Sequence, residues 1–221
     1  MSVPYKIIST GSQGNAVVLN GWLLVDCGVP FKALHAVWHN LRLVLLTHIH
    51  GDHFNRSTIR RLAELRPTLR FGCCRWLVAP LVECGVAEAN IDVLVPDLFF
   101  RYSMCWVVPV RLSHDVPNCG YKIGFKNGRV FYATDTRNLY GIEAKNYDLY
   151  MVEANYVDEE ISERIRAKKE QMEYAYERRV LETHLSKADA DDFIYSNIGP
   201  GGEYVYLHCH QGRNPAKEPK K

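Results

Sequence analysis

The feature that most constrains this chain is a dense group of potential metal-binding side chains directly after an apolar segment. Leu41 to Leu46 is largely aliphatic, which is typical of a strand buried on both faces of a sheet. The segment ends at Thr47, and the next six residues, His48 to His53, contain three histidines and one aspartate. A loop of this composition is hard to explain by packing alone, so we interpret it as a site of chemistry.

The spacing within this loop suits two metal ions. Imidazole and carboxylate groups are common ligands of zinc, manganese and iron. Because alternate residues at the end of a strand point to the same side, His48 and His50 can bind one ion. The tight turn at Gly51 then allows Asp52 and His53 to reach a second ion. Structural zinc sites are usually rich in thiolates and this loop has no cysteine, which favours a reactive site over a purely structural one.

Composition and charge indicate an ordinary globular protein. Of the 221 residues, 47% are hydrophobic and 24% are charged, which is enough apolar material for one sizeable core. The formal charge of +2 does not supply the strong positive field of indiscriminate nucleic-acid binders. No segment approaches the roughly 20 apolar residues of a membrane span, and the start does not read as a signal peptide. Seven cysteines without zinc-ribbon spacing fit free thiols, so we expect a cytoplasmic protein.

Turn residues and hydrophobic periodicity divide the chain into two strand-rich halves, each followed by helices. Strands are expected at 5–9, 16–19, 22–25, 41–46, 105–112, 120–125, 129–133, 148–152 and 204–207. Helices are expected at 31–39, 57–65, 76–84 and 187–195, with a charged helical region at 159–180. Asn127 and Gly128 predict a hairpin between two of the strands. This order predicts an α/β protein in which sheets pack together with helices outside.

No internal repeat, linker or domain boundary is visible, and we expect one domain over residues 1–213. Residues 214–221 contain two prolines and three lysines, and we expect them to form a disordered tail.

The chain resembles the metallo-β-lactamase superfamily, whose signature is His-x-His-x-Asp-His after a strand. The likeness extends over nearly the whole chain, because three later segments look like the later metal motifs of that family in the same order. These are Ser113-His114-Asp115 through Gly120-Tyr121, then Ala133-Thr134-Asp135-Thr136, and finally Leu207-His208. The resemblance implies a four-layer αββα sandwich.

The resemblance also implies a set of ligands for two ions, expected to be zinc with manganese as an alternative. His48, His50 and His114 would bind one ion, Asp52, His53 and His208 the other, and Asp135 both. Asp52 is expected to serve catalysis as well as binding. Two ions about 3.5 to 4 Å apart can share an attacking hydroxide and stabilise the charge that develops on a phosphoryl oxygen.

Two further segments resemble a phosphodiesterase branch of the family. Residues 9–15, Ser-Thr-Gly-Ser-Gln-Gly-Asn, and Val25-Asp26-Cys27-Gly28 look like a subgroup with bacterial exonuclease-like proteins and phage anti-Pycsar phosphodiesterases. The latter destroy the cyclic pyrimidine mononucleotide signals of antiviral defence. Hydrolysis of β-lactams is disfavoured, because no secretion signal is visible and Asp135 stands where drug-hydrolysing enzymes commonly use cysteine.

Glu153 and His184 resemble the acid and the histidine that assist departure of the leaving group in RNase Z relatives. His184 could protonate a ribose oxygen while Glu153 orients its ring. The alternative is that His184 only caps or packs at the start of the helix at Lys187.

We therefore expect a metal-dependent phosphodiesterase acting on small cyclic nucleotides, such as cyclic CMP and UMP. The chain is short, only weakly basic, and has no room for the large clamp domain of many nucleic-acid-processing relatives. The alternatives are a DNA or RNA 5′ exonuclease, whose binding would weaken steeply with salt, a module that sequesters a nucleotide uncleaved, and a glyoxalase-like thioester hydrolase.

Three groups outside these motifs have two possible interpretations. The charged segment 159–179 is a solvated helical face, or it approaches phosphate and base together with Tyr174 and Tyr176 or forms a dimer contact. A homodimer is expected. His35 and His39 fit a polar surface better than a metal site, and His210 fits a surface or supporting position.

Overall fold

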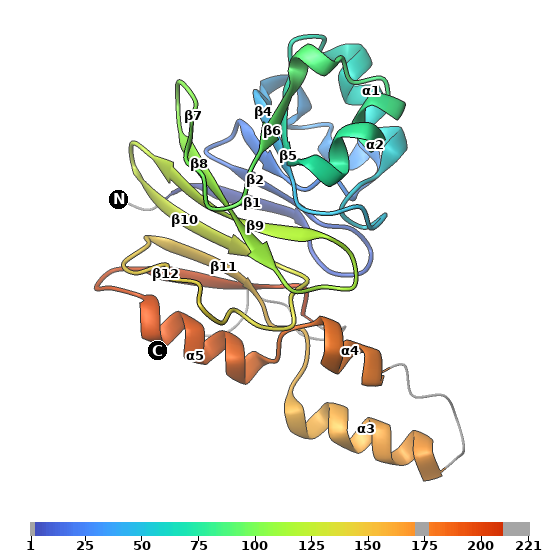
Figure 1. Cartoon of the computed structure of the whole chain (residues 1–221), viewed down its shortest axis with the longest axis vertical. Coiled ribbons are helices and arrows are strands. Elements are labelled where there is room, and N and C mark those ends of the chain that lie inside the picture. The colour runs from blue at the N-terminus through green and yellow to red at the C-terminus, as the bar shows by residue number, and fades with distance from the viewer. Residues whose placement is uncertain (1–2, 171–176, 210–221) are drawn as a thin grey trace.

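The computed structural model of the chain describes residues 3–170 and 177–209, which form two six-stranded sheets (Figure 1). The first sheet contains, in order, β1 (Tyr5–Ser9), β2 (Ala16–Leu19), β3 (Leu23–Val25), β4 (Leu43–Leu46), β5 (Arg70–Cys74) and β6 (Ile91–Leu94). The second contains β12 (Glu203–Leu207), β11 (Leu149–Glu153), β10 (Gly128–Ala133), β9 (Asn118–Phe125), β8 (Trp106–Leu112) and β7 (Phe100–Arg101). Each half of the chain thus builds one sheet.

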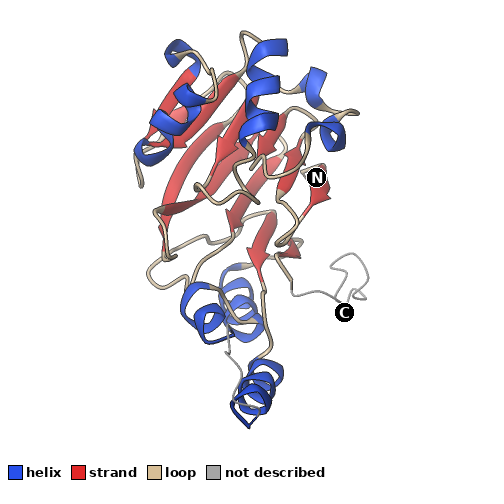
Figure 2. Cartoon of the chain, turned by 90° about the vertical axis from the view of Figure 1, so that its right-hand side faces the viewer, coloured by secondary structure: helices blue, strands red, loops and turns tan. Residues whose placement is uncertain are grey.

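Helices cover the outer faces of both sheets. In Figure 2 the strands lie in the middle, with helices above and below them. The helices are α1 (Arg56–Leu65) and α2 (Val78–Glu83) on the first sheet, and α3 (Asp158–Glu170), α4 (Glu177–Thr183) and α5 (Lys187–Asn197) after β11. The predicted αββα sandwich is confirmed.

Strand β4 explains why the apolar run before the histidines is buried on both faces. Leu43 and Leu45 point into the core between the two sheets. Val44 and Leu46 point the other way and pack with Ile59 of α1. Alternation along the strand therefore places β4 in the middle of the first sheet, between β3 and β5 and parallel to both.

The second sheet uses aromatic residues on both faces. Tyr132 faces the core between the sheets. Its neighbour Phe131 faces the outer core, where Ala190 and Ile194 of α5 pack. The hairpin between β9 and β10 pairs Phe125 with Gly128, which agrees with the turn predicted there.

The helix predicted over residues 31–39 is wrong. The structure has two short 3₁₀ turns instead, Phe31–Leu34 and Trp38–Asn40. Arg66, at the end of α1, donates hydrogen bonds to the carbonyls of Trp38 (2.9 Å) and Leu41 (2.8 Å). A distant side chain thus holds the backbone carbonyls at the end of this segment, directly before β4 begins at Leu43.

The charged helical region consists of α3 and α4. In α3 only Ile161 is buried, and the helix extends away from the body of the molecule (Figure 1). Tyr174 and Tyr176 lie outside the described residues, as do His210 and the tail at 214–221. No helix in the described ranges is long and apolar enough to cross a membrane.

The strands that carry the sequence motifs point in one direction at the sheet edge. β3 and β4 are parallel, and so are β10, β11 and β12. β8 is antiparallel to β9, which is antiparallel to β10, so β8 runs with β10. The loops at the carboxyl ends of these strands therefore meet at one edge of the sandwich.

Candidate metal centre

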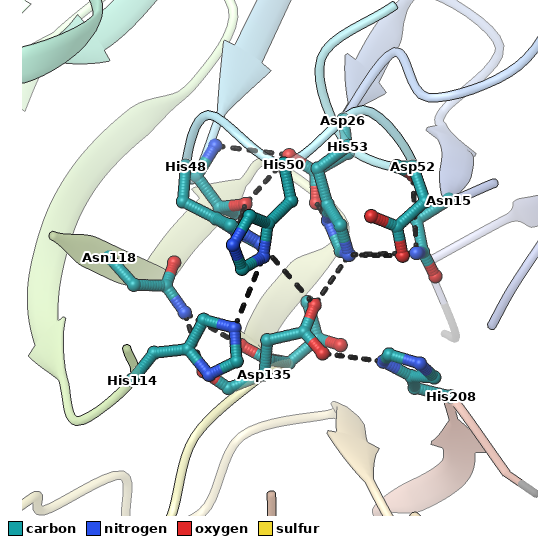
Figure 3. A network of polar contacts seen from close by, with 12 residues as sticks. Asn15, Asp26, His48, His50, Asp52, His53, His114, Asn118, Asp135 and His208 are labelled. Carbon is teal, nitrogen blue, oxygen red and sulfur yellow. Dashed lines mark hydrogen bonds and ion pairs between the residues drawn. The ribbon is translucent and has the colours of Figure 1, made fainter. Parts of the chain in front are cut away.

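The first group of ligand atoms comes from both sheets. His48 and His50 lie in the loop after β4, and His114 follows β8. One nitrogen of each ring lies within 4.8 Å of the others, and His114 Nε2 is 3.3 Å from His50 Nδ1 (Figure 3). His48 is fully buried, whereas the His50 side chain is 34% exposed, so this group opens to solvent through His50.

Asp135 lies between the first group and the remaining histidines. Its Oδ2 is 2.5 Å from His53 Nε2 and 3.7 Å from His48 Nε2. Its Oδ1 is 2.6 Å from His208 Nδ1 (Figure 3). Asp135 is only 2% exposed, so one buried carboxylate contacts side chains from both halves of the chain.

Asp52 lies at the edge of this arrangement. Its Oδ2 is 3.8 Å from His53 Nε2, and its side chain is 26% exposed. The three groups of ligand atoms within 4.8 Å of one another among the described residues do not include it. Of the seven ligands expected from the sequence, Asp52 is therefore the one held least closely.

Glu153 and His184 are also brought together, beside Asp135. His184 Nδ1 is 2.5 Å from Glu153 Oε1 and 3.2 Å from Asp135 Oδ1. Glu153 is fully buried at the end of β11 and also accepts a hydrogen bond from the Thr136 amide, at 2.9 Å. A buried acid thus holds the Nδ1 edge of the His184 ring.

A network around Asp26 determines which nitrogen each buried histidine offers. Asp26 Oδ2 accepts from His53 Nδ1 at 2.8 Å, and Oδ1 accepts from the Thr47 hydroxyl at 2.9 Å. Because that hydroxyl gives its proton to Asp26, it accepts from His48 Nδ1, 2.9 Å away. His114 Nδ1 donates to the Thr183 carbonyl at 2.9 Å. All three rings therefore present Nε2 to the centre, the arrangement expected of metal-ligating histidines.

The loop before β2 packs directly against the histidine loop. The Asn15 amide nitrogen of the backbone donates to the Asp52 carbonyl at 2.6 Å, and the Asn15 side chain lies 2.7 Å from His53 Nε2. A Cβ added at Gly28 would lie 1.7 Å from the Asp52 carbonyl oxygen. Only glycine fits there, which explains why residue 28, two positions after Asp26, is a glycine.

Three residues of the centre have a left-handed backbone. Asp26, Asp135 and His208 have φ angles of 59°, 53° and 48°. Each follows the end of a strand, where it redirects the chain toward the centre. Asn118 supports Asp135 by donating to its backbone carbonyl at 2.7 Å. Such conformations are uncommon for residues with a side chain and gather at functional sites.

The charge and burial of the centre suit cations. Burial lowers the pKa of His48, and the charge at His53 lowers it further, so the His48 ring is neutral. Burial alone would raise the pKa of Asp135, but His53 and His208 outweigh it and hold that pKa well below its usual range. His48 and Asp135 are thus in the forms that bind metal ions, whereas at His53 the effect of burial is outweighed by Asp135 and Asp26, which raise its pKa, so a metal ion at His53 Nε2 would displace a proton.

Buried polar atoms without hydrogen bonds supply an independent test of this fit. Within the described residues, His48 Nε2, both carboxylate oxygens of Asp135 and His208 Nδ1 are buried and make no well-formed hydrogen bond. Such atoms are rare in folded proteins. They converge on one another, so divalent metal ions bound among them would satisfy all of them at once. The residues present fit a divalent metal site.

Comparison with known proteins identifies the fold family. A family model described as "Beta-lactamase superfamily domain" matches residues 21–184. The chain belongs to the metallo-β-lactamase superfamily. This superfamily comprises metal-dependent hydrolases, including phosphodiesterases. A search of curated proteins found no match.

Several solved structures share this metallo-β-lactamase fold. The metallo-β-lactamase fold protein YhfI from Bacillus subtilis is 15% identical, with 97% of this chain and 89% of that chain covered and a TM-score of 0.71. The short form of human tRNase Z is 18% identical, with 94% and 93% covered and a TM-score of 0.68. A diphosphatase of the PhnP family is 13% identical, with 98% and 92% covered and a TM-score of 0.65.

The metallo-β-lactamase centre opens into a cleft of about 280 Å³. Its walls include four histidines of the centre together with Asp52 and Asp135. Two further charged residues line it, Asp115 after β8 and Arg179 on α4, and they form an ion pair. The centre is therefore accessible to a small substrate from one side.

Sequence reasoning did not assign a role to Asn15, Asp26 or Asp115, and it named Arg179 only as one of several basic residues of segment 159–179 that could approach phosphate. Asp26 and Asn15 lie in segments that carried the family resemblance, but their contacts with His53 join parts of the chain far apart in sequence. Asp115 and Arg179 meet only because α4 folds back onto the loop after β8. A buried aspartate directly after a buried strand was the one local indication for Asp26.

Proposed function

We propose that this protein hydrolyses a phosphodiester bond in a small cyclic nucleotide. The observation that carries this proposal is the position of His184. The ring is held by the buried Glu153 and lies in the same cleft as the histidines and Asp135. A centre that only bound metal would not need a proton donor beside it.

The proposed centre holds two divalent ions, with zinc favoured by the ligand types. His48, His50 and His114 would hold one ion, His53, His208 and Asp52 the other, and Asp135 both. Two such ions supply Lewis acidity and activate water for attack on phosphorus. The protein's own contribution is to hold its ligands in fixed tautomers, through Asp26 and Thr47.

His184 is proposed to protonate the departing ribose oxygen. Burial by itself would lower the pKa of His184, but the charges of Glu153 and Asp135 outweigh it and raise the pKa to about 10. The two carboxylates thus favour the protonated form of the ring. Glu153 holds Nδ1, so the other ring nitrogen, Nε2, is left for the leaving group.

The size and charge of the cleft support a small substrate. Its volume of about 280 Å³ lies just below the usual range for ligand pockets, roughly 300–1,000 Å³. Among the described residues that line it, Arg179 is the single lysine or arginine. A polymer that tracks several phosphates would need more. Cyclic CMP and cyclic UMP fit this description, and their removal would counteract antiviral signalling.

A nuclease is the second candidate, favoured by the similarity in fold to human tRNase Z. The two functions separate by product analysis. Zinc- or manganese-loaded protein is incubated with cyclic CMP, cyclic UMP, cyclic AMP and short single-stranded DNA and RNA, with Asp135→Ala as the control. Cleavage of the cyclic mononucleotides alone supports the proposal, whereas shortening of the polymers with the cyclic nucleotides intact would replace it by the nuclease. Light scattering on the same samples tests the proposed homodimer.

A further inference from the structure

Helix α4 brings a basic side chain to the mouth of the cleft. Arg179 forms an ion pair with Asp115, the residue after His114. The other carboxylate oxygen of Asp115 lies 3.2 Å from His114 Nε2 and 3.4 Å from His50 Nε2. A single carboxylate therefore separates the Arg179 guanidinium from the first group of histidines.

Helix α4 is tied to the loop after β8 by a hydrogen bond, and its own hydrogen bonds carry that link back to Arg179 and on to His184. The Thr183 carbonyl accepts the hydrogen bond of His114 Nδ1 at 2.9 Å, and the Thr183 hydroxyl donates to the Arg179 carbonyl at 2.8 Å. The amide of His184 donates to the Val180 carbonyl, also at 2.9 Å. One short helix thus links the backbone of Arg179 to a proposed metal ligand and to the proposed proton donor.

The pair between Arg179 and Asp115 contributes little to stability. The Arg179 side chain is 67% exposed and the Asp115 side chain 23%, and ion pairs this exposed contribute little to stability. An exposed guanidinium held over the cleft can contact a ligand there as well.

The charge of the cleft points to the kind of ligand. Asp52, Asp115 and Asp135 make its lining acidic, yet a phosphodiester is an anion. Of the residues described there, Arg179 is the one with a permanent positive charge. A guanidinium has five N–H donors in a planar fork, so it can contact a carboxylate and a phosphate at the same time.

We propose that Arg179 binds a non-bridging oxygen of the substrate phosphate, and that Asp115 is the positioning residue that holds its guanidinium over the cleft. This inference rests on the proposed function, because it names the group that receives the phosphate of that substrate. On this inference Arg179 of α4 contributes to substrate affinity, whereas cleavage of the bond depends on the metal centre.

The test compares four zinc-loaded proteins: wild type, Arg179→Gln, Arg179→Lys and the matched control Arg178→Gln. Arg178 is exposed on the same helix and does not line the cleft, so the control removes the same charge one residue away. With cyclic CMP, Arg179→Gln should raise KM roughly tenfold to a hundredfold, the loss expected for one charged hydrogen bond, with kcat changed much less. Arg179→Lys should retain part of the affinity, and Arg178→Gln should match wild type.

A second measurement separates this inference from the proposed function. Inorganic phosphate is titrated into the same four proteins by calorimetry, after metal analysis and circular dichroism show equal loading and folding. Weaker phosphate binding in Arg179→Gln alone supports the inference even if wild type cleaves no cyclic nucleotide, in which case only the substrate class fails. Unchanged KM and unchanged phosphate affinity in Arg179→Gln would overturn the inference while leaving hydrolysis intact.

Asp115→Asn tests the positioning role. The amide still accepts a hydrogen bond from Arg179 but lacks the charge, so KM should rise less than in Arg179→Gln, with kcat preserved. A fall in kcat and bound metal with KM unchanged would instead make Asp115 part of the metal centre and overturn its assignment.

Discussion

The two halves of the molecule contribute to the centre in different ways. The first half supplies His48 and His53, which are fully buried and held through Asp26 and Thr47. The second half supplies His114, His184 and Arg179, which lie nearer the cleft and are positioned by the end of β11 and by α4. We therefore expect the buried contacts of the first half to contribute mainly to metal affinity, and His184 and Arg179 of the second half to contribute mainly to turnover and substrate affinity.

Asp135 joins the two halves, and its removal should have the largest effect. In Asp135→Ala both proposed metal ions would lose the carboxylate that they share, so phosphodiesterase activity should fall by at least roughly a thousandfold. Metal analysis should find less than the full complement of ions. Full metal content with near-normal turnover would contradict the central position given to Asp135.

His184→Ala should separate chemistry from metal binding. Loss of the proton donor should lower kcat by about 10² to 10⁴-fold, with metal content unchanged. Single-turnover kinetics with cyclic CMP measures the effect. His35→Ala, which removes an exposed histidine outside the cleft, is the control. If the rate of His184→Ala equals that of wild type, His184 only packs before α5.

Asp26→Asn should weaken metal binding through the ligands of the first half alone. The amide keeps the shape of the carboxylate but cannot hold His53 Nδ1–H and Thr47 in the same way, so metal affinity should fall about 10- to 100-fold. Competition with a chelator measures this. Asp97→Asn is a matched control, because Asp97 also has a left-handed backbone conformation (φ 66°) but its side chain is exposed. Equal metal affinity in the two variants would remove the distinction drawn between the halves.

The smallest effect is expected from the helix caps, one in each half. Asn55 accepts from the Thr58 amide at the start of α1, and Ser186 accepts from the Asp189 amide at the start of α5. Replacement of either by alanine should lower the free energy of unfolding by about 1 kcal/mol. Urea denaturation measures the change. A much larger loss in one variant alone would mean that its half of the molecule relies on more than the cap.

Local patterns were sufficient to predict most strands and sheets that pack together with helices outside, whereas the four-layer αββα sandwich was implied by the family resemblance. The alternation along β4 is a property of four adjacent residues, and the hairpin at Asn127 depends on two. At 31–39 the structure has two 3₁₀ turns in place of the predicted helix, and the end of this segment is held by Arg66, which lies far away in sequence and binds the carbonyls of Trp38 and Leu41. No window of sequence around residue 35 contains that information.

The candidate site was likewise predicted in part from the sequence. The histidines and Asp135 were predicted as a group from the family resemblance, and their roles as ligands stay predictions. The contacts of Asp26 and the ion pair of Arg179 with Asp115 could not be predicted, because each joins residues at least 21 positions apart in sequence. A family resemblance identifies the residues of the motifs, but it does not reveal which other side chains hold those residues in place.

The left-handed backbone at Asp26, Asp135 and His208 has a consequence for how this chain tolerates change. Conformations of this kind cost of order 1–3 kcal/mol each for residues other than glycine. Glycine at any of these positions would relieve the strain and remove the side chain that the centre needs. Selection for thermal stability alone would thus tend to erase the centre, so an engineering campaign on this scaffold should screen for function at every round.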